Sequence, residues 1–175
     1  MMRPFKRRRR DKRLVVTLPE PTAQVLRHVV ADLTAVLDEP SGVVGDRLYP
    51  RAYLDPTEET AEETWQSVVH DDLQRARVDA VTAVLADIDG AQAASHGNVE
   101  IVLDDEGETR WLTVLNDARL ALGTALGVTE DEPLEFPSGD ARRPVADVYV
   151  LLTMLQGELV EAALSVLPEA GSGED

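Results

Sequence analysis

The sequence predicts an α+β protein that is predominantly helical, with four or five packed helices and a small pair of short strands. Hydrophobic residues make up 43% of the 175-residue chain but aromatic residues only 4%, so the core must consist mainly of Leu, Val and Ala. This composition favours helices, because aromatic and β-branched residues are the ones that favour strands. Apolar residues also recur at three- and four-residue spacing along most of the chain, which is the period of an amphipathic helix.

Short strands are expected at residues 13–18 (RLVVTL) and 99–103 (VEIVL). The second alternates apolar and polar residues, as a half-buried strand does. We expect the two strands to pair, because a lone strand would leave its backbone donors and acceptors unmet. Between them, a first amphipathic helix is expected from Thr22, and Pro40 ends it.

Asp55 and Pro56 predict the start of the next helical segment. Aspartate is a favoured N-cap residue, and proline is tolerated in the first turn because its missing N–H would be unpaired there anyway. Trp65 lies on the apolar stripe that follows, and we expect a structural role for it. Either one helix spans 56–89, or the segment breaks near Asp71, which could cap a new helix; the break is favoured.

Two further helices complete the predicted fold. Asp104 or Asp105 is expected to cap a helix that ends at Gly127, since glycine is common just beyond a helix C-terminus. Pro144 is expected to open the last helix, after an acidic loop that contains two prolines.

Several classes of function are disfavoured by what the sequence lacks. It has no cysteine, which excludes disulfides, thiolate chemistry and zinc sites built from cysteine. It has no run of 18 apolar residues and no signal-peptide pattern, so we expect a cytoplasmic protein with no membrane contact. None of its three histidines lies in a known catalytic motif, so we expect no enzymatic activity, metal or cofactor. The histidines are His28, His70 and His96.

Charge divides the chain into an arm, a body and a tail. Residues 1–12 are expected to be a basic disordered arm, 13–167 a single mainly helical domain, and 168–175 a flexible tail. The first 13 residues carry a net charge of +7, and the rest of the chain carries −23. The cations of the arm could contact DNA phosphates without reading sequence, or could solubilise the chain or lie against its own acidic body. These cations are Lys6, Arg7, Arg8, Arg9, Arg10, Lys12 and Arg13.

The stretch RLYPRAYLDP (47–56) is the candidate surface for contact with a protein partner. In an extended segment, Arg47, Tyr49, Arg51 and Tyr53 would share one face because they alternate along the chain. Arginine and tyrosine are enriched in binding hot spots. Alternatively, the same four residues could only hold a long connection in place through cation–π and hydrogen-bond contacts.

Asn116 and Arg119 are polar residues within an otherwise apolar helical segment. Embedded polar groups are usually buried and paired, and Asp72 or Asp71 would be a suitable carboxylate for Arg119. We therefore expect a structural salt bridge there, with a role in partner binding as the second alternative.

Three motifs together resemble an actinobacterial family long catalogued as a domain of unknown function. They are RLYPRAYLDPTEE (47–59), WQSVVHDDL (65–73) and LNDARLALGTALGVTED (115–131), and the resemblance covers most of 13–167. Genes of this family often lie beside the Clp adaptor and a cysteine-biosynthesis cluster. The family is associated with an oxidative-stress transcription regulator that works with an alternative sigma factor of RNA polymerase. Its proposed redox sensing uses cysteines, which this chain lacks, so thiol sensing is excluded here.

The resemblance and the charge division together predict a transcriptional regulator of the oxidative stress response. It would act by contact with a sigma factor, and the basic arm would add non-specific attraction to DNA. An adaptor or regulator in Clp-dependent protein turnover is the alternative, and a homo-oligomer remains open. The sequence identifies neither the effector nor the promoter.

Overall fold

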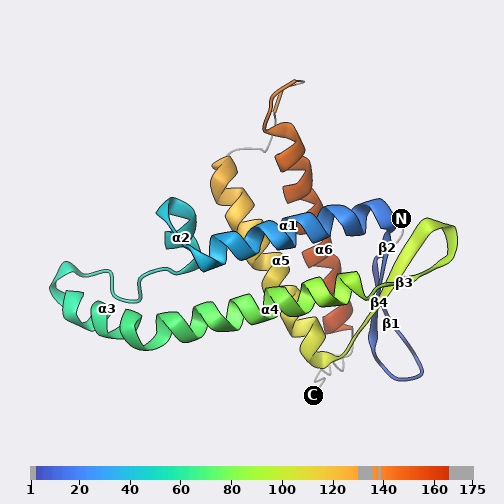
Figure 1. Cartoon of the computed structure of the whole chain (residues 1–175), viewed down its shortest axis with the longest axis horizontal. Coiled ribbons are helices and arrows are strands. Elements are labelled where there is room, and N and C mark those ends of the chain that lie inside the picture. The colour runs from blue at the N-terminus through green and yellow to red at the C-terminus, as the bar shows by residue number, and fades with distance from the viewer. Residues whose placement is uncertain (1–2, 130–135, 138, 166–175) are drawn as a thin grey trace, which may run out of the picture.

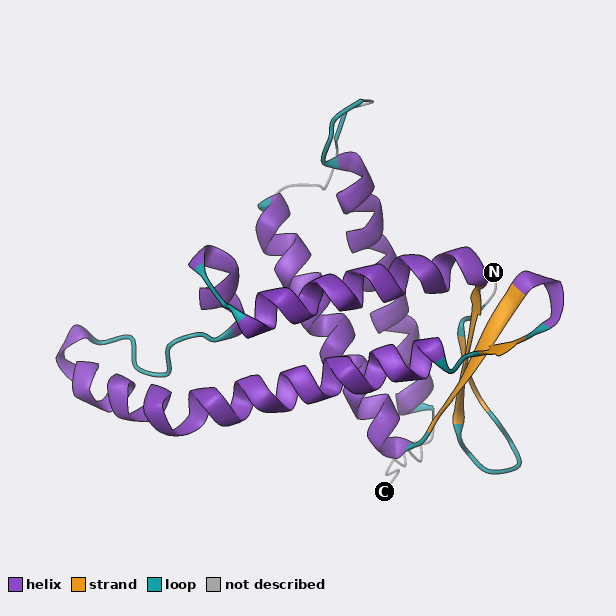
Figure 2. Ribbon diagram, viewed as in Figure 1, coloured by secondary structure: helices purple, strands orange, loops and turns teal. Residues whose placement is uncertain are grey.

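The computed structural model describes residues 3–129, 136–137 and 139–165 (Figure 1). It confirms a predominantly helical α+β fold with a small sheet, in which six helices and four strands are described (Figure 2). In chain order they are β1 (Phe5–Arg7), β2 (Leu14–Pro19), α1 (Glu20–Asp38), α2 (Gly42–Leu48), α3 (Glu59–Trp65), α4 (Asp71–Asp89), β3 (Gln92–Ala93), β4 (Asn98–Leu103), α5 (Asp105–Leu126) and α6 (Arg143–Leu164).

The long helices form two crossing pairs. α1 packs along α4, α5 packs along α6, and α5 also contacts α1, α2 and α4 (Figure 1). Trp111 of α5 is fully buried, lies against Phe5 of β1, and donates its indole N–H to Asp87 of α4 at 2.9 Å. Leu, Val and Ala side chains fill most of the remaining core, as the composition predicted. The leucines with almost no exposed surface are Leu14, Leu26, Leu37, Leu48, Leu103, Leu115, Leu152, Leu155 and Leu159.

The ends of α5 and α6 lie where the turn residues predicted them. The carboxylate of Asp104 accepts a hydrogen bond of 2.7 Å from the backbone N–H of Gly107. At the other end of α5, Gly127 adopts a left-handed conformation with φ of 70°, which glycine tolerates without strain. Pro144 lies in the first turn of α6.

The sheet is larger than predicted and runs β1-β2-β4-β3, with every neighbouring pair antiparallel. β2 pairs with β4 from Leu14 opposite Leu103 to Pro19 opposite Asn98, which is the pairing expected between the two predicted strands. β1 and β3 are short edge strands of three and two residues, and a period of two cannot be recognised over so few positions.

β1 corrects the prediction of a disordered arm for residues 3–12, while residues 1–2 and the predicted flexible tail at 168–175 lie outside the described residues. Phe5 pairs with Val16, is buried, and lies edge-on to Trp111 with 6.5 Å between the ring centroids. This contact removes apolar surface from water, which the repulsion among the neighbouring cations does not offset. The segment is therefore the first strand of a β1–β2 hairpin.

The helical segment after Asp55 runs on without a break as far as Asp89. A short 3-10 turn (Pro56–Glu58), α3, a π-helical segment (Gln66–His70) and α4 follow one another. The predicted cap at Asp71 is absent, since Asp71 itself has helical backbone angles. The π-helical segment instead changes the phase of the helix, so the face that α4 buries does not continue along α3.

α2 occupies part of the stretch expected to be extended. Its two glycines and seven-residue length give no clear helical signal in the sequence. Gly45 is needed where α2 passes the preceding chain, because a Cβ there would lie 2.8 Å from the carbonyl carbon of Pro40. Within the described residues, no helix is long and apolar enough to cross a membrane.

Candidate interaction surfaces

The β1–β2 hairpin presents most of the predicted cations on an ordered turn. Backbone hydrogen bonds from Arg8 N to Arg13 O (2.8 Å) and from Lys12 N to Arg8 O (3.0 Å) close the turn. Its exposed cations, which we call the basic hairpin, are Lys6, Arg8, Arg9, Arg10, Lys12 and Arg13. Arg8 lies 3.7 Å from Asp11, and this is the one ion pair found in this group among the described residues.

Arg7 differs from its neighbours because its charge faces the body of the protein. Its two terminal nitrogens donate to the carboxylate of Glu108 at 2.9 and 2.7 Å, and Nη1 also donates to the carbonyl of Lys12. Both side chains of the pair are largely buried. Arg7 therefore anchors the hairpin to α5. Its charge is paired with Glu108, which corrects the prediction that Arg7 contacts DNA phosphates.

Tyr49 does not lie on the predicted partner surface, because only 9% of the residue is exposed. The guanidinium of Arg77 lies 4.8 Å from the centre of its ring, and the His70 ring lies 4.9 Å away. Burial raises the pKa of the Tyr49 hydroxyl, although the positive charge of Arg77 partly opposes the rise. The ring thus fixes the end of α2 against α4, which is the structural alternative for this residue.

Arg77 and Asp117 form a buried ion pair that the sequence did not reveal. Arg77 Nε lies 3.4 Å from the carboxylate of Asp117, and its Nη1 donates to the carbonyl of Leu48. Burial raises the pKa of Asp117, and Arg77 partly lowers it again. The helical period carried by Trp111, Val114 and Ala118 could have indicated that Asp117 lies on the buried face of α5.

The chain between α2 and α3 is held by local hydrogen bonds to Glu62, a further residue that we did not predict. Its carboxylate accepts from the backbone N–H groups of Ala52 (3.0 Å) and Tyr53 (2.8 Å) and from the side chain of Gln66. The bond from Gln66 and these backbone bonds lower the pKa of Glu62. A buried carboxylate thus replaces the missing core contacts of this segment.

Arg51 and Asp55 complete these local contacts. Arg51 forms a 2.6 Å ion pair with Glu59. The carboxylate of Asp55 accepts from the backbone N–H of Thr57 at 2.8 Å, and Pro56 occupies the first helical position. Arg47, by contrast, belongs to α2, so the four residues expected to share one extended face do not do so.

The outer end of the continuous helical segment formed by α3 and α4 exposes a group of apolar side chains, which we call the α3 tip. Leu54 is 82% exposed and Val68 66%, and Tyr53 and Trp65 are also exposed. Trp65 therefore lies at the surface, although in sequence it continues an apolar stripe. Tyr53, Trp65, Val68 and neighbouring threonines line an open groove of about 780 Å³. Glu58 is the one carboxylate among the described residues that line this groove, whereas Glu59 and Glu63 line a separate hollow with Arg51.

The predicted salt bridge between Arg119 and Asp72 or Asp71 is wrong. Asp72 pairs with Arg75 at 2.9 Å, one turn along α4, and Asp71 lies 3.6 Å from the ring of His70. Arg119 donates to Gln156 of α6 at 3.1 Å, and Gln156 in turn donates to Asn116 at 3.2 Å. These residues link α5 to α6, and Asn116 and Arg119 line a cavity with Arg47.

No metal centre is found among the residues that the structure describes, where no group of three or more His, Asp or Glu side chains could hold an ion.

Comparison with known proteins identifies the family of this chain. Residues 2–163 match the model of a family described as a domain of unknown function, DUF2017. The chain belongs to this family.

A curated relative carries a functional name. It is a protein of Mycobacterium leprae (strain TN) named "Putative oxidative stress regulator AosR", which is 37% identical over 71 residues. The match covers 41% of this chain and 32% of the relative, so the chain matches about a third of that protein's length. No solved structure gives a significant match.

Proposed function

We propose that this protein regulates transcription in the oxidative stress response by contact with an alternative sigma factor, and that it acts as a binding protein without catalysing a reaction. The name of the Mycobacterium relative supports a regulatory role. The sigma factor is our extension of that role from the family resemblance, and the contact surface is proposed from the geometry of the α3 tip.

The observation that carries this proposal is the exposed apolar groove at the α3 tip. Contiguous apolar surface bordered by polar residues is typical of protein-binding sites, and exposed Trp and Tyr are enriched there. Glu58 in the lining and the net charge of −23 on the body favour a partner whose apolar side chains are flanked by basic ones. A sigma factor fits this chemistry, because a protein that binds DNA must itself present basic surface.

The basic hairpin would add attraction to DNA at the opposite end of the molecule (Figure 1). Its six exposed cations could neutralise phosphates and release counterions, which gives salt-dependent binding without sequence preference. The acidic body would be repelled by DNA, so binding should depend on the hairpin alone. A complex with a DNA-bound sigma factor would then contact both partners at once.

Affinity purification from oxidatively stressed cells of the native host tests the sigma-factor contact. Val68→Glu places a charge in the groove, and Val150→Glu is its matched control, because Val150 is an exposed valine on α6 at 57% exposure. We expect one alternative sigma factor to co-purify, after nuclease treatment, with the wild type and Val150→Glu but not with Val68→Glu.

Three results would reject this proposal. Loss of the sigma factor from both variants, or from neither, would mean that the groove is not the contact surface. Nuclease-resistant recovery of a Clp chaperone in its place would favour the role in protein turnover. A change in self-association alone, measured by size-exclusion chromatography, would assign the groove to a second copy of the chain.

A further inference from the structure

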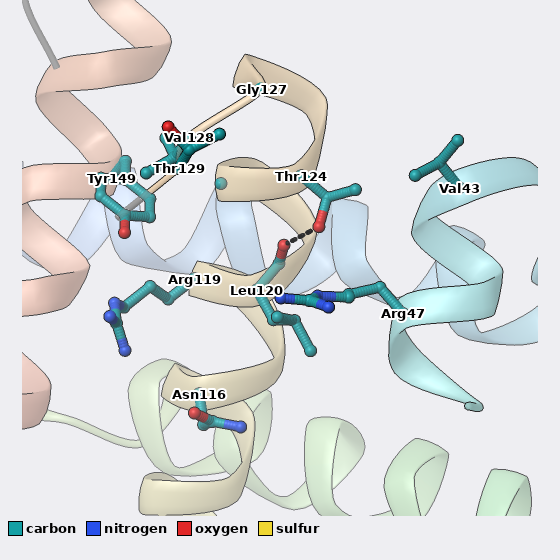
Figure 3. Close-up of a pocket in the computed structure, with 11 residues that line it drawn as sticks. Val43, Arg47, Asn116, Arg119, Leu120, Thr124, Gly127, Val128, Thr129 and Tyr149 are labelled. Atoms are coloured by element: carbon teal, nitrogen blue, oxygen red, sulfur yellow. Dashed lines mark hydrogen bonds between the residues drawn. The ribbon is translucent and has the colours of Figure 1, made fainter. Parts of the chain in front are cut away.

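A cavity of about 580 Å³ lies between α2, α5 and α6, away from both interaction surfaces. Figure 3 shows α5 between the other two helices, with Arg47 directed toward it from α2 on one side and with Arg119 and Tyr149 on the side of α6. This volume is within the range of small-molecule sites in proteins. The side chains and backbone that line the cavity belong to Val43, Arg47, Asn116, Arg119, Leu120, Gly123, Thr124, Gly127, Val128, Thr129 and Tyr149.

The charge of this cavity is opposite to that of the body around it. Its described lining includes two arginines and no carboxylate, although the body carries a net charge of −23. Of the nine arginines beyond residue 13, six form ion pairs with carboxylates among the described residues. Arg47 and Arg119 are two of the remaining three, and the third is Arg143. The fold thus places in one hollow two arginines that have no carboxylate partner among the described residues.

Arg119 is held in position while part of its hydrogen-bonding capacity is unused. One terminal nitrogen donates to Gln156, and the guanidinium carbon lies 5.8 Å from the centre of the Tyr149 ring. Its Nε is buried and has no partner among the described residues. Because Nε has almost no accessible surface, the donor that a ligand can reach is the second terminal nitrogen, for which no hydrogen bond is found among the described residues.

The rest of the lining indicates what else the ligand carries. Val43, Leu120 and the Tyr149 ring provide apolar surface beside the arginines, and Asn116 and Thr124 provide neutral polar groups. The Tyr149 ring lies directly over Gly123, where a Cβ would approach it to 2.9 Å. Arginine binds carboxylate and phosphate groups through paired N–H donors.

We propose that this cavity binds a small anionic molecule with a carboxylate or phosphate group, held by Arg47 and Arg119, and a short apolar part against Leu120 and Tyr149. Such a ligand could act as an effector in a chain that has no cysteine for redox sensing. The proposal does not depend on the sigma-factor contact, because anion binding is measured with the purified protein alone. Either proposal can therefore fail without the other.

Isothermal titration at fixed ionic strength tests the site with three probes. Malonate is a dicarboxylate, inorganic phosphate is the second anion, and malonamide is the uncharged analogue of malonate. We expect saturable binding of malonate or phosphate by the wild-type protein and none of malonamide. The stronger of the two anions indicates whether the natural group is a carboxylate or a phosphate.

Arginine variants locate the binding. We expect Arg47→Gln and Arg119→Gln each to weaken it roughly tenfold or more, because each removes a charge-assisted hydrogen bond. Arg143→Gln is the matched control and should bind as the wild type does. Since Arg47 is exposed, its variant will fold even if the Arg119→Gln variant, without its bond to Gln156, loosens α5.

Two outcomes would overturn the proposal. One is the absence of saturable binding of both anions to the wild-type protein. The other is an equal loss of affinity in Arg143→Gln and Arg47→Gln, which would show a general charge effect and no site.

Discussion

The two ends of the molecule are both densely charged, but they are attached to the body in different ways. At the hairpin end, Phe5 is buried against Trp111, and Arg7 pairs with Glu108 of α5. At the α3 tip, the contacts are local: Glu62 holds the backbone of residues 52–53, and Arg51 pairs with Glu59. The hairpin end is thus part of the core, and the α3 tip extends beyond it (Figure 1).

This difference determines which side chains each end leaves exposed. The hairpin buries its apolar residue and presents its cations, so it suits a phosphate backbone. The tip buries a carboxylate and presents its apolar residues, so it suits a protein. Substitutions at the hairpin anchor should therefore lower global stability, whereas substitutions at the tip should alter only local order and binding.

The largest effect we expect is on DNA binding by the basic hairpin. Replacing Arg8, Arg9, Arg10 and Lys12 with Gln should abolish nearly all affinity for duplex DNA. The slope of log affinity against log salt should also fall by roughly 3 to 4, about 0.9 for each phosphate that the variant no longer neutralises. A salt titration followed by fluorescence anisotropy measures both quantities. Unchanged binding would mean that the acidic body carries a DNA surface.

Phe5→Ala should give the largest loss of stability. Removing a buried aromatic ring that contacts Trp111 should lower the free energy of unfolding by about 3 kcal/mol. Leu54→Ala at the α3 tip should change it by less than about 0.5 kcal/mol, because Leu54 is exposed. Urea unfolding of the two variants compares the ends directly, and equal losses would contradict the difference we describe.

Substitutions of Arg7 and Arg9 compare a cation that anchors the hairpin with an exposed cation of the same short segment. Arg7→Gln should lower the free energy of unfolding by about 2 kcal/mol, since it leaves the largely buried carboxylate of Glu108 with a weaker donor. Arg9→Gln should have almost no effect on stability but should weaken DNA binding. If Arg7→Gln is neutral in urea unfolding, the arm is not anchored in solution.

The smallest effect is local and depends on pH. The pKa of Glu62 is lowered in the folded protein, so its stabilising contribution is present above its ordinary pKa and is lost as the pH falls through the lowered value. Protection of the Ala52 and Tyr53 amides from hydrogen exchange should decrease over the same pH range. Glu62→Gln should remove this pH dependence without lowering global stability, and Glu63→Gln, an exposed neighbour, should retain it. Protection unaffected by Glu62→Gln would contradict the role of this carboxylate.

The sequence predicted the features that depend on hydrophobic periodicity and on capping and turn residues. The helical stripes, the caps at Asp55 and Asp104, the C-cap glycine and the pairing of β2 with β4 all follow from local chemistry. It did not predict β1, because the run of cations outweighed a single phenylalanine whose partner, Trp111, is more than 100 residues away.

The interaction surfaces were less predictable for the same physical reason. Alternation in RLYPRAYLDP suggested one extended face, but α2 takes up Arg47 and a long-range contact with Arg77 buries Tyr49. Trp65 continues the apolar stripe of α4 in sequence, yet the π-helical segment and the lack of a neighbouring helix leave it exposed. Burial by distant partners cannot be read from local spacing.

The central claim is that the α3 tip is the surface that binds an alternative sigma factor. A photo-crosslinking amino acid placed at Val68, with Val150 as the matched control position, tests it in oxidatively stressed cells of the native host. We predict an adduct with an alternative sigma factor from position 68 and none from position 150. No sigma-factor adduct from position 68, or equal adducts from both positions, would contradict the claim.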